Sequence, residues 1–534
     1  MKRILILLIL FSFVKMNAQS NFDTTSLKVT KGDLETNTYP QDSIANALVI
    51  YEEGNSFIHK KTFKLITEIK RKIKIFNKDN ASDRATIEVF LYKSDQKSRK
   101  EKIKNIEATT YNLVNNKVIK TKLNTSEIFE EEYNKNNTIV KFTMPNIKDG
   151  SVITYSYTLE SPFIYKYHDW EFQSDIPTIF SKYKASIPGN YNYNIRLVGF
   201  LKLSEEKTER ERECLLAFNG FIADCAVTTY TMRDIPAYIE EDYVTSKYNY
   251  LSMISYELKT YTDFEGKKHH YTKTWKTADK ELKLNTNIGK QLGKVSITKD
   301  LFNSSYLSEA NPLEKAKAIY QYVQNTYNWN NEHKLFKDVS IKNLIKNKSG
   351  KASEINILLH NILKTNDFKV KPILLSTRKN GFVTKLYPVI SDFNYLIVEA
   401  NIDGKLYFLD ATDKYLSFGE IPFKCLNGYG RLLDFKNGSQ WIDIKATKYS
   451  TIQHQIKLDL SDKGGLHGYI NSRYVGYHAL PKKKAYYSNS SKYLEDFENE
   501  HESLSIIEHT VKSNGKADVK FQESFEIEVN DLNI

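Results

Sequence analysis

Alternation of apolar and polar residues dominates the first half of the chain. Residues 69–76 (Ile-Lys-Arg-Lys-Ile-Lys-Ile-Phe) and 86–91 (Thr-Ile-Glu-Val-Phe-Leu) repeat with a period of two, as half-buried strands do. The turn dipeptide Asp149-Gly150 leads into a further alternating run at 151–157. These patterns predict a large antiparallel β-sandwich-like domain over residues 19–290.

A helical period replaces this alternation in the middle of the chain. Asn311, Pro312 and Glu314 have the residue types of a helix start, with a cap, a first-turn proline and an acid at the third position. Apolar residues then recur at helical spacing. A second helix, apolar on one face, is expected after Gly350.

Strand-like runs follow the two helices. They occupy residues 368–376, 395–400 and 405–410. The last two are joined by Asp403-Gly404, a hairpin turn signal. Two helices followed by antiparallel strands predict an α+β domain over residues 297–445, and renewed alternation predicts a C-terminal β domain over residues 450–534.

The first residues determine the expected compartment. Residues 1–18 have a basic start at Lys2 and Arg3, an apolar run over residues 4–14, and a small residue, Ala18, at the end. This is the order of a secretory signal peptide, and the run is too short for the ~20 apolar residues of a membrane span. We expect a periplasmic or secreted protein, cleaved after about Ala18, with no transmembrane helix in the mature chain.

The chain has three cysteines, which excludes a disulfide-framework protein and a four-cysteine zinc module. Cys214 and Cys225 flank Asn219-Gly220, a hairpin signal, at equal distances. They are expected to face each other across the hairpin, within the Cα separation that a disulfide allows. Two free thiols remain the alternative. Cys425 is left over and is expected to be a buried, inert thiol.

The formal net charge of +12 raises the question of an anionic partner. Export argues against nucleic acid, and the basic residues of the densest segment, 93–104, are interrupted by Asp95 and Glu101. A solvated strand edge is the simpler interpretation. The pair His269-His270 has no carboxylate or thiolate at ligand spacing, so no metal site and no cofactor are expected.

Short motifs in the middle domain resemble the transglutaminase-like fold, a relative of papain-type cysteine proteases. They lie at residues 349–352 (Ser-Gly-Lys-Ala), 392–395 (Asp-Phe-Asn-Tyr) and 408–412 (Phe-Leu-Asp-Ala-Thr). Their order matches the family's Gly-x-Cys at a helix start, Phe-Asn-His on a strand, and Leu-Asp-Ala/Pro-Thr on the next strand. The resemblance therefore implies a central α+β domain of the papain-like type.

The upstream β half resembles DUF3857, a domain that often precedes a transglutaminase-like domain in exported Gram-negative bacterial proteins. The matching residues are Pro145, Asp149-Gly150-Ser151, Tyr157, residues 170–173 (Trp-Glu-Phe-Gln), Ile176-Pro177 and residues 234–236 (Asp-Ile-Pro). Together the two resemblances cover most of residues 45–445.

The catalytic positions of the family are altered in this chain. Ala352 stands where the resemblance places a nucleophilic cysteine, Tyr395 stands where it places the base, and only Asp410 is retained. Alanine offers no nucleophile, and a tyrosine hydroxyl with a pKa of about 10 is a poor general base at neutral pH. We therefore expect a pseudoenzyme. For Asp410, a structural hydrogen bond with Tyr395 or nearby backbone and a contact to a ligand both remain open.

The degenerate site is expected to border a cleft. Its candidate lining residues are Trp329, Ser353, Glu354, Asn356, Phe393 and Asn394. His360 is interpreted as a packed or partly exposed histidine, and His333 has no evident partner. Three functions stay open: binding or scaffolding of a peptide, glycan or envelope protein; a hydrolase or peptidase with an atypical active site; and a purely structural component of an envelope assembly.

Overall fold

A computed structural model describes the chain in twelve ranges: residues 22–94, 99–134, 136–165, 167–216, 220–271, 274–302, 311–446, 448–460, 465–501, 503–512, 515–516 and 518–529. The chain divides into two compact units, Met1–Val244 with Tyr248–Thr272, and Thr245–Lys247 with Lys273–Ile534. The multidomain, mostly β architecture expected from the sequence is confirmed. The expected signal peptide, residues 1–18, lies outside the described residues. Residues 273–290, assigned above to the first domain, belong to the second unit.

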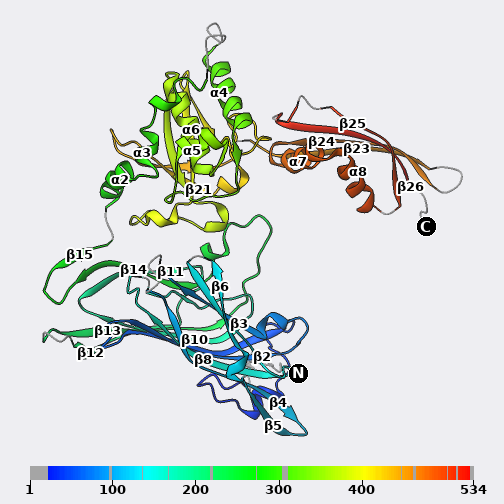
Figure 1. Ribbon diagram of the computed structural model, residues 1–534. Helices are drawn as coiled ribbons and strands as arrows, with labels where there is room; N and C mark the ends of the chain where they lie inside the picture. The colour runs from blue at the N-terminus through cyan, green and yellow to red at the C-terminus, as the bar shows by residue number, and fades with distance from the viewer. Residues whose placement is uncertain are drawn as a thin grey trace, which may run out of the picture. The chain divides into compact units, whose positions relative to one another are not determined.

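An eight-stranded sheet is the frame of the first unit (Figure 1). Its strands, in spatial order, are β12 (Glu205–Leu216), β13 (Ile222–Ile235), β10 (Thr178–Pro188), β1 (Ala47–Ile58), β2 (Leu65–Ile75), β8 (Val152–Ser161), β4 (Lys102–Val114) and β5 (Lys117–Lys122). Neighbours are antiparallel except β1 and β10, which run parallel. The prediction of a purely antiparallel sheet is wrong at this pair, because β10 returns beside β1, in the same direction, after the chain has passed through eight intervening strands.

Two smaller sheets complete the first unit. One contains β11 (Tyr191–Val198), β14 (Met253–Thr262), β15 (Lys268–His270) and β9 (Trp170–Glu171), and the other contains β3 (Thr86–Tyr92), β7 (Asn137–Thr143) and β6 (Ile128–Asn134). Each has its own core: Trp170, Tyr183 and Tyr256 share one cluster, whereas Val89 and Phe142 belong to another. Burial of these aromatic side chains is the main force that joins the sheets.

The last part of strand β2, residues 72–75, is buried on both faces, which its alternating sequence does not reveal. Lys72 and Lys74 have no exposed side-chain surface. A short helix, α1 (Lys31–Glu35), supplies partners for both: Lys72 Nζ lies 3.4 Å from Asp33 Oδ2, and Lys74 Nζ donates to the carbonyl oxygen of Leu34 at 2.8 Å. Within the strand predicted at 69–76, Lys70 is exposed as alternation predicts, whereas Lys72 and Lys74 are buried and have partners, as buried charges must.

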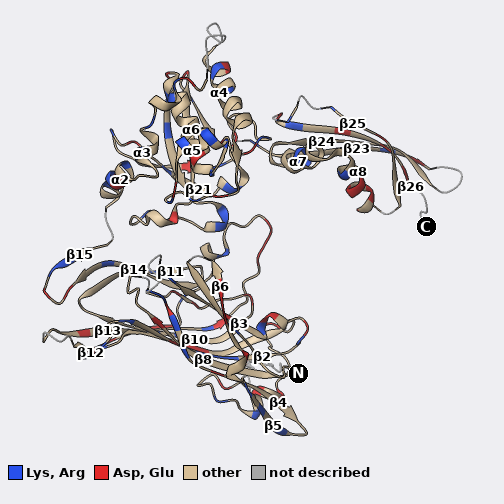
Figure 2. Ribbon diagram, viewed as in Figure 1, with Lys and Arg blue, Asp and Glu red and all other residues tan. Residues whose placement is uncertain are grey.

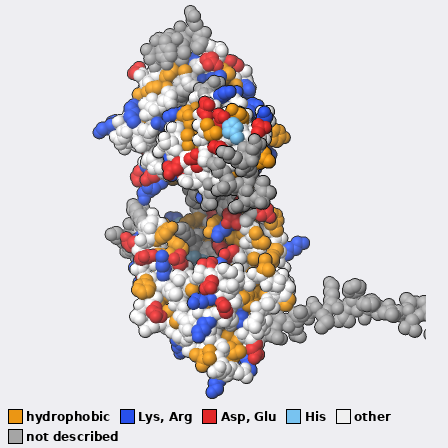
Figure 3. Space-filling view, turned by 90° about the vertical axis from the view of Figure 1, so that its right-hand side faces the viewer, with side chains coloured by type: hydrophobic (Ala, Val, Ile, Leu, Met, Phe, Trp, Pro, Cys, Tyr) orange, Lys and Arg blue, Asp and Glu red, His pale blue; other side chains and the backbone are white. Residues whose placement is uncertain are grey.

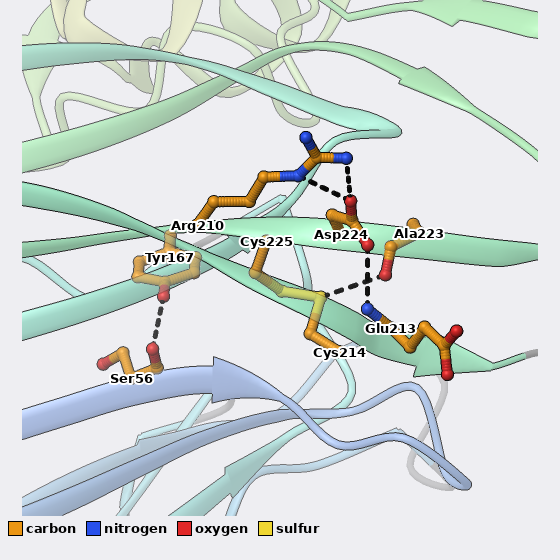
Figure 4. Close-up of a disulfide and its surroundings, with 8 residues drawn as sticks. All are labelled: Ser56, Tyr167, Arg210, Glu213, Cys214, Ala223, Asp224 and Cys225. Carbon is orange, nitrogen blue, oxygen red and sulfur yellow. Dashed lines mark hydrogen bonds and ion pairs between the residues drawn. A yellow bond between two sulfur atoms is a disulfide. The ribbon is translucent and has the colours of Figure 1, made fainter.

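The hairpin of β12 and β13 contains a disulfide between Cys214 and Cys225, with Cα atoms 5.7 Å apart (Figure 4). The two residues are not direct partners in the ladder, because the register pairs Cys225 with Glu211 and shifts before Leu215. The expected direct opposition of the cysteines is thus wrong. Glu213 has a φ of 51° in this bulge, and its N–H donates to Asp224 Oδ1 at 2.8 Å, so the bulge carries Cys214 to its partner.

The second unit begins with helices that surround a five-stranded antiparallel sheet. The helices are α2 (Trp275–Leu284), α3 (Gly289–Leu292), α4 (Pro312–Thr326), α5 (Ile341–Asn347) and α6 (Ala352–Thr365). The strands, in spatial order, are β20 (Lys405–Leu409), β19 (Tyr395–Ile402), β18 (Lys369–Leu375), β21 (Gly428–Leu432) and β22 (Gln440–Ile444). Helix α4 begins at Pro312 with Asn311 as its cap, as predicted. Helix α6 packs on β18 and β19 and is buried from Ala352 to Leu363.

The C-terminal part of the second unit has its own four-stranded antiparallel sheet. In spatial order the strands are β23 (Thr451–Leu460), β24 (Leu466–Val475), β26 (Lys520–Val529) and β25 (Leu504–Val511). Two helices, α7 (Ala479–Ser488) and α8 (Ser490–Asn499), cover one face of it, as Figure 1 shows. The prediction of a C-terminal β domain therefore missed these two helices. The spacing of Tyr493, Leu494 and Phe497 is the helical signal that was missed.

Charged residues of both signs are distributed over the elements of each unit (Figure 2). The face in Figure 3 likewise mixes lysine and arginine with aspartate and glutamate. The excess of basic residues is therefore not gathered into one extended patch on that face. No helix within the described residues is long and apolar enough to cross a bilayer.

Candidate functional site

The start of helix α6 is fixed by a tight turn and a buried carboxylate. A Cβ atom on Gly350 would lie 2.5 Å from Glu354 Oε2, so this position accepts only glycine without a shift of the carboxylate. Glu354 accepts hydrogen bonds from the N–H of Lys351 (2.8 Å) and of Ser340 (2.7 Å). Ala352 follows as the first helical residue and is fully buried. A nucleophile here would sit at the positive end of the helix, but the methyl group has no such chemistry.

Ala352, Tyr395 and Asp410, the three positions that the family resemblance singles out, belong to one buried region. Asp410 follows β20, and Oδ1 of its carboxylate accepts from both the N–H (2.9 Å) and the hydroxyl (2.5 Å) of Thr412. Tyr395 begins β19, and its hydroxyl lies 3.2 Å from Thr412 Oγ1. Since the threonine hydrogen points to the carboxylate, the tyrosine is the donor. Asp410 thus has a structural role, with Thr412 placed between it and Tyr395.

Asn356 completes the hydrogen bonds of the buried aspartate. Its amide donates to Asp410 Oδ2 and to the carbonyl oxygen of Leu396, both at 2.9 Å, and its carbonyl oxygen accepts from the N–H of Ala411 at 3.0 Å. Every polar atom of this side chain faces protein. Asn356, expected to border a cleft, is therefore a brace between α6, β19 and the end of β20.

The electrostatics of the site are unfavourable for base catalysis by Tyr395. Burial, and next the nearby Asp410 carboxylate, raise the pKa of Tyr395 well above its usual range. The hydroxyl therefore remains protonated at any physiological pH and acts as a hydrogen-bond donor. With Ala352 at the helix start, neither group can perform the first step of acyl transfer.

Most of the predicted cleft residues face the interior. Ser353 is buried and donates to the carbonyl oxygen of Lys334 at 3.2 Å. Phe393 packs in a separate core near Trp441, with ring centroids 6.1 Å apart. Asn394 exchanges hydrogen bonds with Thr377. Ser353 lies on α6, which is covered on all sides, and Phe393 and Asn394 precede β19 beside the core of Trp441 and the Thr377 loop, which a linear motif does not show.

A pocket of about 520 Å³ lies beside the hydrogen-bonded triad positions. Its wall contains Trp329 and Thr412, and also Phe423 and Lys424 from a 3-10 turn, η8 (Phe423–Cys425). Trp329 is the one predicted cleft residue in this wall. No pattern in the sequence indicates that Lys424 belongs to this site, because the turn that contains it approaches Trp329 only in the folded chain.

His333 is a further residue whose position the sequence does not predict. Its ring lies between Trp329 and Tyr395, with centroid distances of 5.2 Å and 5.3 Å. Burial, followed by the positive charge of Lys424, lowers the pKa of His333, while Asp410 acts in the opposite direction. The imidazole is therefore neutral at pH 7 and packs as part of an aromatic group that contains Trp329, His333 and Tyr395.

Other reactive side chains of the second unit are enclosed. Cys425 is a buried free thiol, and burial raises its pKa well above the usual range. His360 is buried and hydrogen-bonds to Asn361 Oδ1 at 2.9 Å. Nowhere in the described part of the chain do three or more histidine, cysteine or acidic side chains gather closely enough to hold a metal ion.

Residues 64–239 match the family model described as a domain of unknown function with solved structure, DUF3857. This confirms the resemblance of the β half over that range. No curated protein matches the chain.

Several solved structures are similar at low sequence identity. A "putative protease" from Parabacteroides distasonis has 12% identity and a TM-score of 0.47, with 91% of this chain and 94% of that chain covered. A "putative cysteine protease" from Cytophaga hutchinsonii has 12% identity and a TM-score of 0.16, with 67% and 88% covered. Yeast LTA4 hydrolase has 12% identity and a TM-score of 0.18, with 42% and 31% covered. None of these scores reaches 0.5, and none assigns an activity to this chain.

Proposed function

We propose that this chain is an exported, non-catalytic binding protein with a transglutaminase-like domain, and that the pocket beside the degenerate triad holds a peptide or glycan of the cell envelope. The residue at position 352 is the observation on which the proposal rests. The first turn of α6, where the family's chemistry needs a thiolate, has only the methyl group of Ala352. The Cys214–Cys225 disulfide supports export, since such bonds persist in oxidising compartments.

The architecture of the site supports binding rather than residual chemistry. Asp410 is occupied by Asn356 and Thr412, and Tyr395 is a buried donor, so no polar group of the former triad is left to activate water. The adjoining pocket is nevertheless open and lined by aromatic and charged side chains. A site of this size and composition suits a small segment of a larger ligand.

The first test measures catalysis by the native chain. We expect no incorporation of a dansylated amine into casein and no cleavage of a quenched fluorescent peptide library above a protein-free blank. The outcome that would contradict the proposal is turnover by the wild type that persists after thiol alkylation and is lost in Asp410→Asn. The matched control Asp443→Asn changes an exposed carboxylate of the same unit and should have no effect.

A second arm tests whether positions 352 and 395 have the geometry of a triad. We expect the thiol introduced by Ala352→Cys to react with iodoacetamide faster when Tyr395→His is also present, because an imidazole partner favours the thiolate. Cys425 is the buried reference thiol in the same molecule. Equal rates in the single and double variants would show that the two side chains do not form a catalytic pair.

A further inference from the structure

Lys424 has an unusual environment in the wall of the pocket. Its ammonium group lies 3.7 Å from the ring centroid of Trp329 and 5.0 Å from that of Tyr395. Among the described residues it has no hydrogen bond and no ion pair. The neighbouring lysine of the pocket wall, Lys484, is by contrast paired with Asp413 at 2.5 Å.

Lys424 is half-buried, and the aromatic rings compensate only part of the hydration that its ammonium group loses. The attraction of a cation to an aromatic face is modest, whereas removing a charge from water is costly. Burial accordingly lowers the pKa of Lys424, and Asp410 opposes this only through space, because its oxygens are held by Asn356 and Thr412. Three N–H donors of the ammonium remain for a ligand.

The other charged side chains of the wall also favour an anionic ligand. Lys414 and Lys484 add positive charge, and the carboxylate of Asp413 already accepts from Lys484 and from the N–H of Tyr415 (3.0 Å). The amides of Asn328 and Asn331 offer both donors and acceptors, but the formal charges of the wall sum to a positive value, which a neutral sugar does not compensate. A carboxylate needs donors alone. Trp329 and Phe423 provide a flat apolar surface next to Lys424 for the group that carries the charge.

We propose that the ligand of this pocket is a peptide carboxylate, which pairs with Lys424 while an adjoining apolar side chain lies on Trp329. The inference rests on the proposed binding function and specifies its ligand class. It distinguishes a peptide from a glycan, which the proposed function leaves together.

The test uses the native full-length protein and the reactivity of Lys424 itself. The protein is acetylated with an N-hydroxysuccinimide ester in the presence of N-acetylphenylalanine, its neutral amide, or methyl glucuronide, and each lysine is followed by mass spectrometry. At a probe concentration of about ten times Kd, we expect N-acetylphenylalanine to slow the acetylation of Lys424 about tenfold, because a covered amine cannot react. Exposed Lys436 is the internal control and should react equally in all samples.

The alternative outcomes separate this inference from the proposed function. Equal protection by the amide would overturn the carboxylate while a binding pocket remains. Protection by methyl glucuronide and not by N-acetylphenylalanine would overturn the peptide in favour of an acidic glycan. If no probe protects Lys424, the inference is wrong, and the absence of catalysis tested above is unaffected, because those assays do not involve Lys424.

A variant series gives an independent readout. Calorimetric affinity for N-acetylphenylalanine should fall about tenfold or more in Lys424→Met, the loss of one charge-assisted hydrogen-bonded pair, and be largely retained in Lys424→Arg. Lys436→Met is the matched control and should bind as the wild type does. Thermal melts establish that the variants are folded. Unchanged affinity in Lys424→Met would contradict the proposed anchor.

Discussion

At the residue scale, Tyr395, Thr412, Asp410 and Asn356 form a chain of satisfied hydrogen bonds. Tyr395 donates to Thr412, Thr412 donates to Asp410, and Asn356 donates to the other carboxylate oxygen. Buried polar groups are stable only when each has a partner, and this chain gives a partner to both oxygens of the Asp410 carboxylate. The aspartate thereby stabilises the fold around α6.

Replacing Thr412 tests this interpretation. Thr412→Val removes the hydroxyl that accepts from Tyr395 and donates to Asp410, so two buried hydrogen bonds are lost and we expect the free energy of unfolding of the second unit to fall by about 3 kcal/mol. Tyr395→Phe removes a donor while Thr412 keeps Asp410, and it should cost about 1 kcal/mol. Hydrogen exchange of the α6 amides measures both. A loss in Thr412→Val no larger than that in Tyr395→Phe would refute the central role of Thr412.

At the element scale, the hairpin of β12 and β13 depends on a covalent link at an irregular register. Strand β12 is at the edge of the eight-stranded sheet and pairs only with β13, as Figure 1 shows. Nine of its residues, 205–213, are exposed, so it gains little from burial. The disulfide and the Asp224 contacts drawn in Figure 4 hold the bulge that a regular ladder would not contain.

Removal of the disulfide is expected to loosen this hairpin selectively. The cysteines lie 11 positions apart in the chain, and a link over that length stabilises the folded hairpin by about 3 kcal/mol through its constraint on the unfolded chain. In Cys214→Ala/Cys225→Ala, the amides of β12 and the adjoining half of β13 should exchange faster, while those of β2 and β8 change little. Cys425→Ala is the control. If these amides exchange as slowly as in the wild type, the strand hydrogen bonds and the Asp224 contacts are sufficient to hold the hairpin without the disulfide.

At the scale of the whole molecule, the two units have separate cores. Each hydrophobic cluster contains residues of one unit only, so each unit has its own source of stability. A perturbation confined to one core should therefore change the stability of that unit alone. His360, in the centre of α6, provides such a perturbation because its charge depends on pH.

Acidification should destabilise the second unit through His360. Burial lowers the pKa of His360 from 6.5 to about 4, so between these values the unfolded chain binds a proton that the native unit does not. Stability is lost as the pH falls through 6.5, by about 2 kcal/mol between pH 7 and pH 5. His360→Gln should remove this part of the pH dependence. Hydrogen exchange of α6 in both proteins measures the difference.

The amides of the eight-stranded sheet are the control for this experiment. They belong to the first unit and should show the same pH dependence in the wild type and in His360→Gln. A change that spreads equally to both units would contradict their independent stability.

Features that depend on local backbone geometry follow directly from the amino-acid sequence. The cap and proline at Asn311 and Pro312 begin α4, and Asp403, with a φ of 51°, joins β19 to β20 as the turn dipeptide indicates. That position 352 offers no nucleophile is equally evident from the sequence, because it depends on residue type alone. Dihedral preferences and chemical identity act within a few residues and need no knowledge of the rest of the chain.

Which surfaces are buried and which side chains meet depends instead on the three-dimensional fold. Lys72 belongs to an alternating strand, yet it is buried because α1 covers that face. Phe393 packs away from the pocket, whereas Lys424 reaches Trp329 across 95 positions of the chain. Periodicity defines the faces of an element, but the partner that covers each face is set by contacts between residues far apart in sequence, and no local pattern encodes those contacts.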